Sequence, residues 1–354
     1  MPIPTLPGIM VETVTTPRIT TRVLTSGFPD AIPVIFVHGN ASSATFWEEM
    51  MLALPVGFRG VAPDLRGYGD ADRSAKIDAT RGLADISDDL AALMEKLSIE
   101  QAHFIAHSLG GSVMWQFLMD YPQRVLTATL AAPGSPYGFG GTKDVDGTPT
   151  YADFAGSGGG VVNPEFAKRM GEGDRSTDSP VSPRNVLNGF YWKPPFKATR
   201  EEELLSSVMS EHIGNKEYPG DLTPSTNWPN VAPGVWGPAN ALSPKYIGDV
   251  SRLFKINPKP TILWVHGKDD QIISDTSLFD VGFLGSLGAI PGWPGAEVHP
   301  PQPMVSQIRA YLEKYKAAGG NYLELELPDT GHSPFIERPA EFNAAFHKLI
   351  QGQG

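Results

Sequence analysis

The sequence of 354 residues contains no cysteine. This absence excludes disulfide bonds, a thiolate nucleophile and a cysteine-based zinc site. The eight histidines show no H-E-x-x-H pattern and no similar metal-ligand spacing. We therefore expect a protein that uses neither a metal ion nor another cofactor.

Basic residues are also scarce, because 28 Lys and Arg stand against 39 Asp and Glu and give a formal net charge of -11. Nucleic-acid binding depends on clustered Lys and Arg, so no nucleic-acid partner is expected. The sequence has no run of 18 apolar residues, and residues 1–7 have neither a basic region nor an apolar core of signal-peptide length. We expect a cytoplasmic protein without a membrane partner, and the oligomeric state is left open.

Apolar residues make up 41% of the sequence, which is enough for a sizeable folded core. The run 34–37 is continuously apolar, and 102–105, 125–131 and 261–265 are mostly apolar; all four have the pattern of strands buried in a parallel sheet. Between them, apolar residues recur at helical spacing, most clearly over 83–97 and 304–315. This alternation predicts the α/β class, with a mostly parallel, doubly wound sheet.

Residues 134–258 interrupt the alternation and are dense in Gly, Pro, Ser and aromatic residues. We interpret them as an inserted, partly helical cap, between a first core part at 1–133 and a second at 259–354. One helix is predicted in the cap, starting at Thr199 with Glu202 as a capping box and continuing to Ile213. The glycine-rich run 156–160 is interpreted as a flexible linker or lid hinge. A second irregular stretch, 274–303, is expected to help wall a pocket.

The stretch Ala106-His107-Ser108-Leu109-Gly110-Gly111 lies between a predicted buried strand and a predicted helix. A chain that turns so sharply needs small neighbours, which Ala106 and Gly110 provide. The turn holds the Ser108 hydroxyl clear of the backbone, and the unpaired N–H groups of the helix start point toward the oxygen of whatever it attacks. Ser108 is therefore the candidate nucleophile.

Three further segments follow predicted strands and carry polar side chains. His38-Gly39-Asn40 follows the strand at 34–37, and Asp269-Asp270 follows the strand at 261–265. His332 follows a predicted strand at 322–327. Catalytic groups in open α/β sheets gather at the carboxyl ends of strands, so we expect these side chains to converge on Ser108.

These motifs resemble those of the α/β-hydrolase superfamily. The elbow resembles G-x-S-x-G, with Ala106 in place of the first glycine, and residues 331–339 resemble the G-H-x-P-x-x-E-x-P signature. The resemblance implies the α/β-hydrolase fold and a catalytic triad, with the amides of two residues as an oxyanion hole. The implied triad is Ser108, Asp270 and His332, with Asp269 as the nearest rival of Asp270, and the implied oxyanion donors are Asn40 and Leu109.

Two other features of the motifs are interpreted as structural. The segment 64–70 resembles the D-x-R-G-x-G loop of the same superfamily, and we expect Asp64 and Arg66 to form a charge pair that holds the loop. The side chain of His38 is expected to be a buried, hydrogen-bonded imidazole.

The segment 38–40 and the large cap are similar to haloalkane dehalogenases and epoxide hydrolases, which attack with an aspartate at the elbow. A serine is better suited to acyl chemistry. We therefore expect hydrolysis of a carboxylic ester or lactone of a fairly bulky apolar small molecule through an acyl-enzyme, with Trp47 and Trp192 in contact with the substrate. Two alternatives stay open: carbon–carbon bond hydrolysis of a diketone by the same triad, and a non-enzymatic ligand receptor on this fold.

Overall fold

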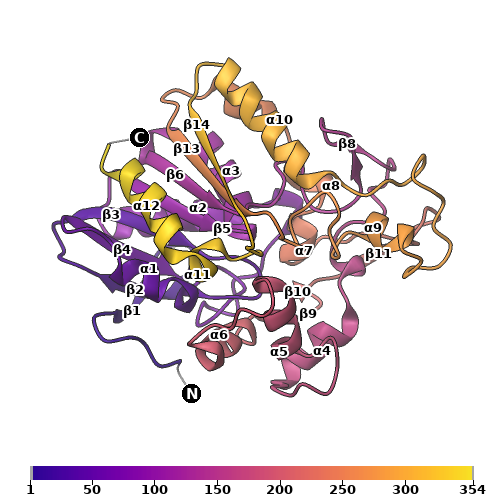
Figure 1. Ribbon diagram of the computed structural model, residues 1–354, viewed down its shortest axis with the longest axis horizontal. Helices are drawn as coiled ribbons and strands as arrows, with labels where there is room; N and C mark the ends of the chain where they lie inside the picture. Colours follow the sequence, from indigo (N-terminus) through magenta and orange to yellow (C-terminus); the bar gives the residue numbers. More distant parts are fainter. Residues whose placement is uncertain (1–2, 353–354) are drawn as a thin grey trace.

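The computed structural model of the protein describes residues 3–352. Within them the central sheet has eight strands in the order β1-β2-β4-β3-β5-β6-β13-β14 (Figure 1). β2 pairs antiparallel with both β1 and β4, and the other neighbours run parallel. This is the mostly parallel, doubly wound sheet that the sequence predicts. The strands are β1 (Met10–Thr15), β2 (Thr20–Ser26), β3 (Ile32–Val37), β4 (Phe58–Pro63), β5 (Ala102–His107), β6 (Val125–Ala131), β13 (Thr261–Gly267) and β14 (Tyr322–Leu327).

Both faces of the sheet are covered, because successive side chains of a strand point to opposite faces. In β3, Ile35 and Val37 lie in one core with residues of α2, α3 and α10, while Val34 and Phe36 lie in a second core shared with the cap. In Figure 1, α11 and α12 lie in front of the sheet, and the fainter α2 and α3 lie behind it. The covering helices are α1 (Glu48–Leu52), α2 (Ala84–Lys96), α3 (Leu109–Asp120), α10 (Met304–Ala317), α11 (Pro334–Glu337) and α12 (Pro339–Ile350).

The segment between β6 and β13 adds no strand to the central sheet in the described part of the chain. It contains more helices than the one predicted, and α4, α5 and α6 lie together below the sheet in Figure 1. A short helix, α9 (Val281–Ser286), lies in the later stretch 274–303. The elements between β6 and β13 are β7 (Thr142–Lys143), β8 (Thr148–Pro149), α4 (Pro164–Glu172), α5 (Pro183–Val186), a π-helical turn (Leu187–Tyr191), α6 (Glu201–Val208), β9 (Ile213–Gly214), β10 (Tyr218–Pro219), β11 (Leu222–Pro224), β12 (Val231–Pro233), α7 (Pro238–Ala241) and α8 (Pro244–Ile247).

The predicted capping box at Thr199 is wrong. Helix α6 starts after Arg200, no side chain caps it, and it ends at Val208 rather than at Ile213. Side chains at the start of α6 contact distant residues instead of capping the helix. Arg200 reaches Glu48 at 3.0 Å, and the carboxylate of Glu202 pairs with arginines of the cap instead of reaching back along the helix.

The glycine-rich run 156–160 is packed in the protein, so its interpretation as a flexible hinge is wrong. The amide of Gly159 donates to Asn240 Oδ1 at 2.8 Å. Gly158 has φ +82°, and a Cβ atom there would lie 2.4 Å from Asn240 Oδ1. The glycines therefore permit close approach of the backbone to a buried asparagine.

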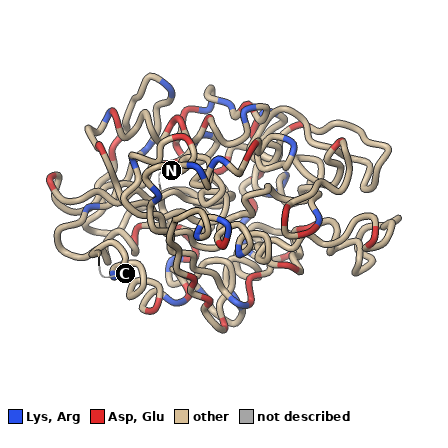
Figure 2. Tube along the Cα trace, turned by 90° about the horizontal axis from the view of Figure 1, so that it is seen from above, with Lys and Arg blue, Asp and Glu red and all other residues tan. Residues whose placement is uncertain are grey.

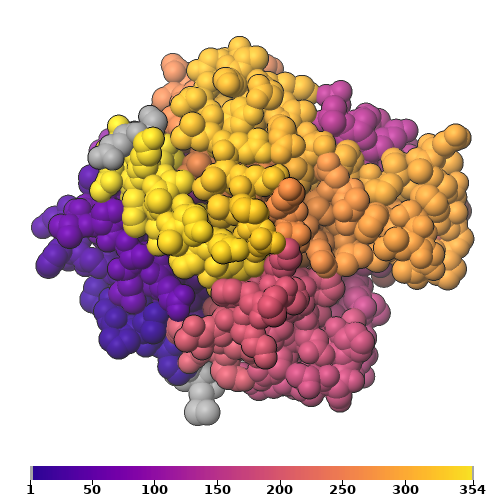
Figure 3. All heavy atoms as spheres, viewed as in Figure 1, coloured from indigo at the N-terminus to yellow at the C-terminus, as the bar shows by residue number. Residues whose placement is uncertain are grey.

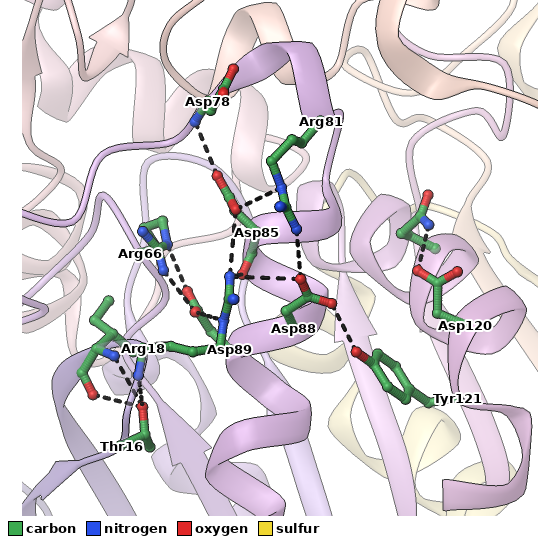
Figure 4. Close-up of polar contacts among 12 residues, drawn as sticks. Thr16, Arg18, Arg66, Asp78, Arg81, Asp85, Asp88, Asp89, Asp120 and Tyr121 are labelled. Carbon is green, nitrogen blue, oxygen red and sulfur yellow. Dashed lines mark hydrogen bonds and ion pairs between the residues drawn. The ribbon is translucent and has the colours of Figure 1, made fainter.

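The predicted pairing of Asp64 with Arg66 is also wrong, because each has a different partner. Asp64 lies 3.5 Å from Arg22 and accepts from the amide of Ala44 at 2.9 Å. Both oxygens of Asp89, on α2, accept from the Arg66 guanidinium at 2.7 Å (Figure 4). Asp64 and Arg66 thus connect the loop after β4 to two different parts of the protein.

The positions of charged residues are dispersed along the chain, with Lys and Arg among Asp and Glu (Figure 2). Over residues 3–352, no group of three or more His, Asp or Glu side chains has an arrangement that would hold a metal ion. None of the helices described there combines the length and the apolar character needed to span a bilayer.

Candidate active site

Ser108 lies at the turn between β5 and α3 in a strained conformation, with φ 54° and ψ -119°. A non-glycine residue rarely adopts a positive φ, and such strain persists only where the surroundings enforce it. Those surroundings are close-packed, because a Cβ atom on Gly110 would lie 2.4 Å from the main-chain oxygen of Val37. Ala106, at the position of the missing glycine, has its methyl group buried in the core. The serine itself is partly exposed.

Asp270 follows β13 and is 5% exposed. Its Oδ1 accepts from the amides of Ile272 and Ile273 at 2.7 and 3.0 Å. Its Oδ2 lies 2.8 Å from Nδ1 of His332. Asp269, the rival residue, instead forms an ion pair with Lys193 of the cap at 3.1 Å.

His332 follows β14 and is 2% exposed. Because a carboxylate only accepts hydrogen bonds, Nδ1 carries the proton in the bond to Asp270, and Nε2 of the neutral ring is an acceptor. The main-chain oxygen of His332 accepts from Nε2 of His107 at 2.9 Å, and the two imidazole centroids are 4.6 Å apart. Since His107 directly precedes Ser108, the structure brings the imidazole to the strand that carries the serine. Among the described residues the Ser108 hydroxyl has no hydrogen bond to His332.

The two predicted oxyanion donors lie on either side of Ser108. Leu109 is the first residue of α3, where main-chain N–H groups have no partner within the helix. On the other side, the β3 loop comes so near that a Cβ atom on Gly39 would lie 3.0 Å from Cβ of Ser108. Asn40 follows that glycine and is partly exposed. The role of both amides stays a prediction.

His38 is the buried structural imidazole that the sequence predicts. It is 1% exposed, and its Nε2 accepts from the amide of Leu65 at 3.0 Å. Its Nδ1 lies 2.8 Å from the oxygen of Gly39. Burial lowers the pKa of His38 to about 4, so the ring is neutral at pH 7.

A polar cluster around the loop of Asn40 was not predicted from the sequence. The hydroxyl of Tyr68 donates to Asn40 Oδ1 at 2.8 Å, and that of Tyr191 donates to the oxygen of Ala41 at 2.8 Å. Glu211, which is 4% exposed, lies beside the Ala41 amide and the Tyr68 hydroxyl. Burial raises the pKa of Glu211 well above its ordinary value. These residues come from three separate segments, which explains why no local pattern revealed them.

The two tryptophans predicted to contact substrate are both buried in the core shared with the cap. Trp47 stacks on Phe335 with centroids 4.3 Å apart, and its ring meets that of His107 edge to face. Trp192 packs edge to face on Phe196. Their contact with substrate stays a prediction, as does the role of the stretch 274–303 in walling a pocket.

Comparison with known proteins identifies the family of the chain. A family model described as the alpha/beta hydrolase fold matches residues 32–280. Over 208 residues the chain is 28% identical to an uncharacterized carboxylesterase of Bacillus subtilis, an alignment that covers 54% of this chain and 67% of that protein. It is 33% identical over 354 residues to epoxide hydrolase A of Mycobacterium tuberculosis, with 94% of each chain covered.

Solved structures agree on the fold. A serine hydrolase from Cycloclasticus zankles, a bacterium that degrades polyaromatic hydrocarbons, is similar with a TM-score of 0.63 and 16% identity. The match covers 98% of this chain and 99% of that one. At this identity the likeness concerns the fold alone. With its sheet order, its strained serine turn and a matching family model over most of its length, the chain belongs to the α/β-hydrolase family.

Proposed function

We propose that this hydrolase cleaves a carboxylic ester or lactone of a small, fairly bulky apolar molecule through an acyl-enzyme. The observation that carries the proposal is the buried contact of 2.8 Å between His332 Nδ1 and Asp270 Oδ2. This contact lies beside a partly exposed serine that is held at a positive φ. A nucleophile, a base and a carboxylate that orients the base are the three groups that acyl transfer requires.

The reaction follows from the tautomer of His332. Because Nδ1 donates to Asp270, Nε2 takes the proton of Ser108 as Oγ attacks the carbonyl carbon. The amides of Leu109 and Asn40 bind the oxygen that becomes negative. The imidazolium then returns the proton to the leaving alcohol as the ester bond breaks. A water molecule, activated by the same imidazole, attacks the acyl group, and the acid leaves as Ser108 is restored.

Asp270 stabilises the imidazolium by charge and by hydrogen bonding. The amides of Ile272 and Ile273 hold its second oxygen, so the carboxylate keeps its orientation when the imidazole becomes charged. The bond from His107 to the carbonyl of His332 fixes the backbone that carries the ring. Ser108 and His332 share no hydrogen bond in the described part of the chain, and catalytic hydrogen bonds often form or shorten only when substrate is bound.

The similarity to epoxide hydrolase A does not favour epoxide opening here. Attack by the Ser108 oxygen on an epoxide carbon would form an ether. Water cannot release an ether by addition to a carbonyl, so the enzyme would stay alkylated after one event. An ester formed between Ser108 and an acyl group has the carbonyl that the second half-reaction needs.

A substrate panel tests the proposal. Aryl esters, lactones, a vinylogous diketone and an epoxide are incubated with the protein and with the Ser108→Ala variant. We expect turnover of esters or lactones, and a loss of at least about 10³-fold in kcat for Ser108→Ala. Turnover of the diketone alone would support the carbon–carbon alternative. Tight binding without turnover across the panel would support a receptor, and ester hydrolysis that survives in Ser108→Ala would contradict the proposal.

A further inference from the structure

Lys193 of the cap touches both loops that carry the proposed acid and base. Its Nζ lies 3.1 Å from Asp269 Oδ2 and 2.9 Å from Asp329 Oδ1. Asp269 directly precedes Asp270, and Asp329 lies three residues before His332. One cap side chain therefore bridges the loop after β13 and the loop after β14.

The main chain of Lys193 makes a second connection, through Glu337. Its N–H donates to Glu337 Oε2 at 2.8 Å, while Oε1 of the same carboxylate accepts from the amide of Gly331 at 2.7 Å. Glu337 is 9% exposed, and burial raises its pKa to about 7. When the carboxyl group is ionised, hydrogen bonds to it are stronger in such surroundings than in water. Because Gly331 directly precedes His332, one buried carboxylate joins the cap to the backbone of the proposed base.

The two segments are also in steric contact. A Cβ atom on Gly331 would lie 2.8 Å from the main-chain nitrogen of Lys193 and 2.8 Å from the carbonyl carbon of Trp192. In the space-filling view, the rose-coloured cap meets the yellow C-terminal segment without a visible gap (Figure 3). Just before this contact, the ring of Tyr191 meets that of His332 edge to face, with centroids 6.2 Å apart. Movement of this cap segment therefore moves atoms that touch His332.

We propose that Lys193 is a positioning residue, which together with Glu337 latches the cap onto the loops of Asp270 and His332. This inference rests on the proposed function, because it assigns those two residues their catalytic roles. Lys193 itself contacts neither of the two side chains that would move the proton. Its effect would instead be to keep the Asp270–His332 pair aligned while the cap is closed, and to release the cap when its contacts break.

The two halves of the latch differ in strength. The side chains of Lys193 and Asp329 are 35% and 74% exposed, so water and salt weaken their ion pair. The contacts of Glu337 are shielded from solvent. We therefore expect removal of the ammonium group to loosen the cap moderately, and replacement of the Glu337 carboxyl group, which accepts from two amides, to loosen it more.

Amide hydrogen exchange of residues 187–197 tests the latch without any need for turnover. Lys193→Met keeps most of the aliphatic chain and removes both ion pairs, so exchange of this segment should be about two- to fivefold faster. Glu337→Gln should accelerate exchange of the Lys193 amide by at least about tenfold. Lys197→Met is the matched control, because Lys197 is exposed in the same segment. Unchanged exchange in both Lys193→Met and Glu337→Gln would overturn the proposal.

Kinetics separate positioning from a merely structural role. Lys193→Met should lower kcat about two- to fivefold with little change in Tm, and Lys193→Arg should restore kcat because its guanidinium also pairs with two carboxylates. High salt should lower kcat of the unaltered protein similarly and leave the variant unaffected. A change in KM alone, or no rescue by Lys193→Arg, would refute the positioning role. If the parent turned nothing over, the proposed function would fail while the exchange result still decided the latch.

Discussion

His107 donates a hydrogen bond from Nε2 to the main-chain oxygen of His332 at 2.9 Å, so the residue before the candidate nucleophile holds the backbone of the proposed base. The bond spans 225 positions of sequence and is fully buried. Burial, with the nearby His332 ring, holds the pKa of His107 well below its usual value, so this imidazole stays a neutral donor.

Replacing His107 should therefore weaken both the fold and the site. His107→Phe fills much of the space but leaves the oxygen of His332 buried without a donor, which costs about 1–3 kcal/mol of unfolding free energy. His107→Gln retains an N–H donor of similar reach and should lose less. Urea denaturation of the two variants measures the difference. Equal losses of unfolding free energy in His107→Phe and His107→Gln would mean that the hydrogen bond contributes little to stability.

The strained backbone at Ser108 should lower the stability of the folded protein, although the proposed activity requires this residue. Ser108→Gly and Ser108→Ala both remove the hydroxyl, but only glycine adopts φ 54° without a steric cost. We expect the unfolding free energy of Ser108→Gly to exceed that of Ser108→Ala by about 1 kcal/mol, because glycine relieves the strain but adds entropy to the unfolded chain. Neither variant should hydrolyse substrate. Equilibrium unfolding in urea checks the comparison. A glycine variant less stable than the alanine variant would show that the turn is not strained.

Gly39 is expected to control the position of the nucleophile. In Gly39→Ala the new methyl group would lie 3.0 Å from Cβ of Ser108 and 3.1 Å from Nδ1 of His107, so one of them must move. Because small displacements at a reacting centre are costly, kcat/KM for an ester should fall about tenfold to 10²-fold. Gly189→Ala is the matched control, since nothing lies within 4 Å of an added methyl there. Equal kinetics of both variants would contradict the close approach at Gly39.

The buried carboxyl of Glu211 predicts a pH-dependent stability. Burial raises its pKa from the ordinary value of 4.5, and the nearby Ala41 amide and Tyr68 hydroxyl offset only part of that rise. A group with a raised folded pKa gives its full stabilisation below the unfolded pKa and loses it as pH rises through the folded value. Relative to the parent, Glu211→Gln should thus gain stability progressively as pH rises above about 4.5.

Thermal unfolding at a series of pH values measures this difference. At pH 4 the two proteins should differ little, because a neutral carboxyl and an amide have similar size and polarity. A Tm difference that stays constant from pH 4 to pH 8 would show that Glu211 is not held neutral in the folded protein.

The sequence predicted the sheet well and the cap poorly, for physical reasons. The run 34–37 is apolar on every residue because both faces of its strand are buried, and β3 includes it. In the cap, short segments take their structure from distant contacts. Arg200 pairs with the distant Glu48, and α6 starts one residue later than its local pattern indicates.

The residues of the candidate site also differ in whether the sequence alone could predict them. Ser108, Asp270 and His332 each follow a strand end in a short local motif, so they could be predicted individually. Glu211 and His107 carry no such motif, and only the folded chain brings them to the loop of Asn40 and to the backbone of His332. Contacts between residues far apart in the sequence produce no periodic pattern from which they could be predicted.

The most direct test of the proposed triad is covalent labelling with a fluorophosphonate, followed by peptide mass spectrometry. We expect one label per chain, on the peptide that contains Ser108. Labelling should be absent in Ser108→Ala and at least about 10²-fold slower in His332→Ala, because the serine then lacks its base. A label on another residue, or an unchanged labelling rate in His332→Ala, would contradict the proposed site.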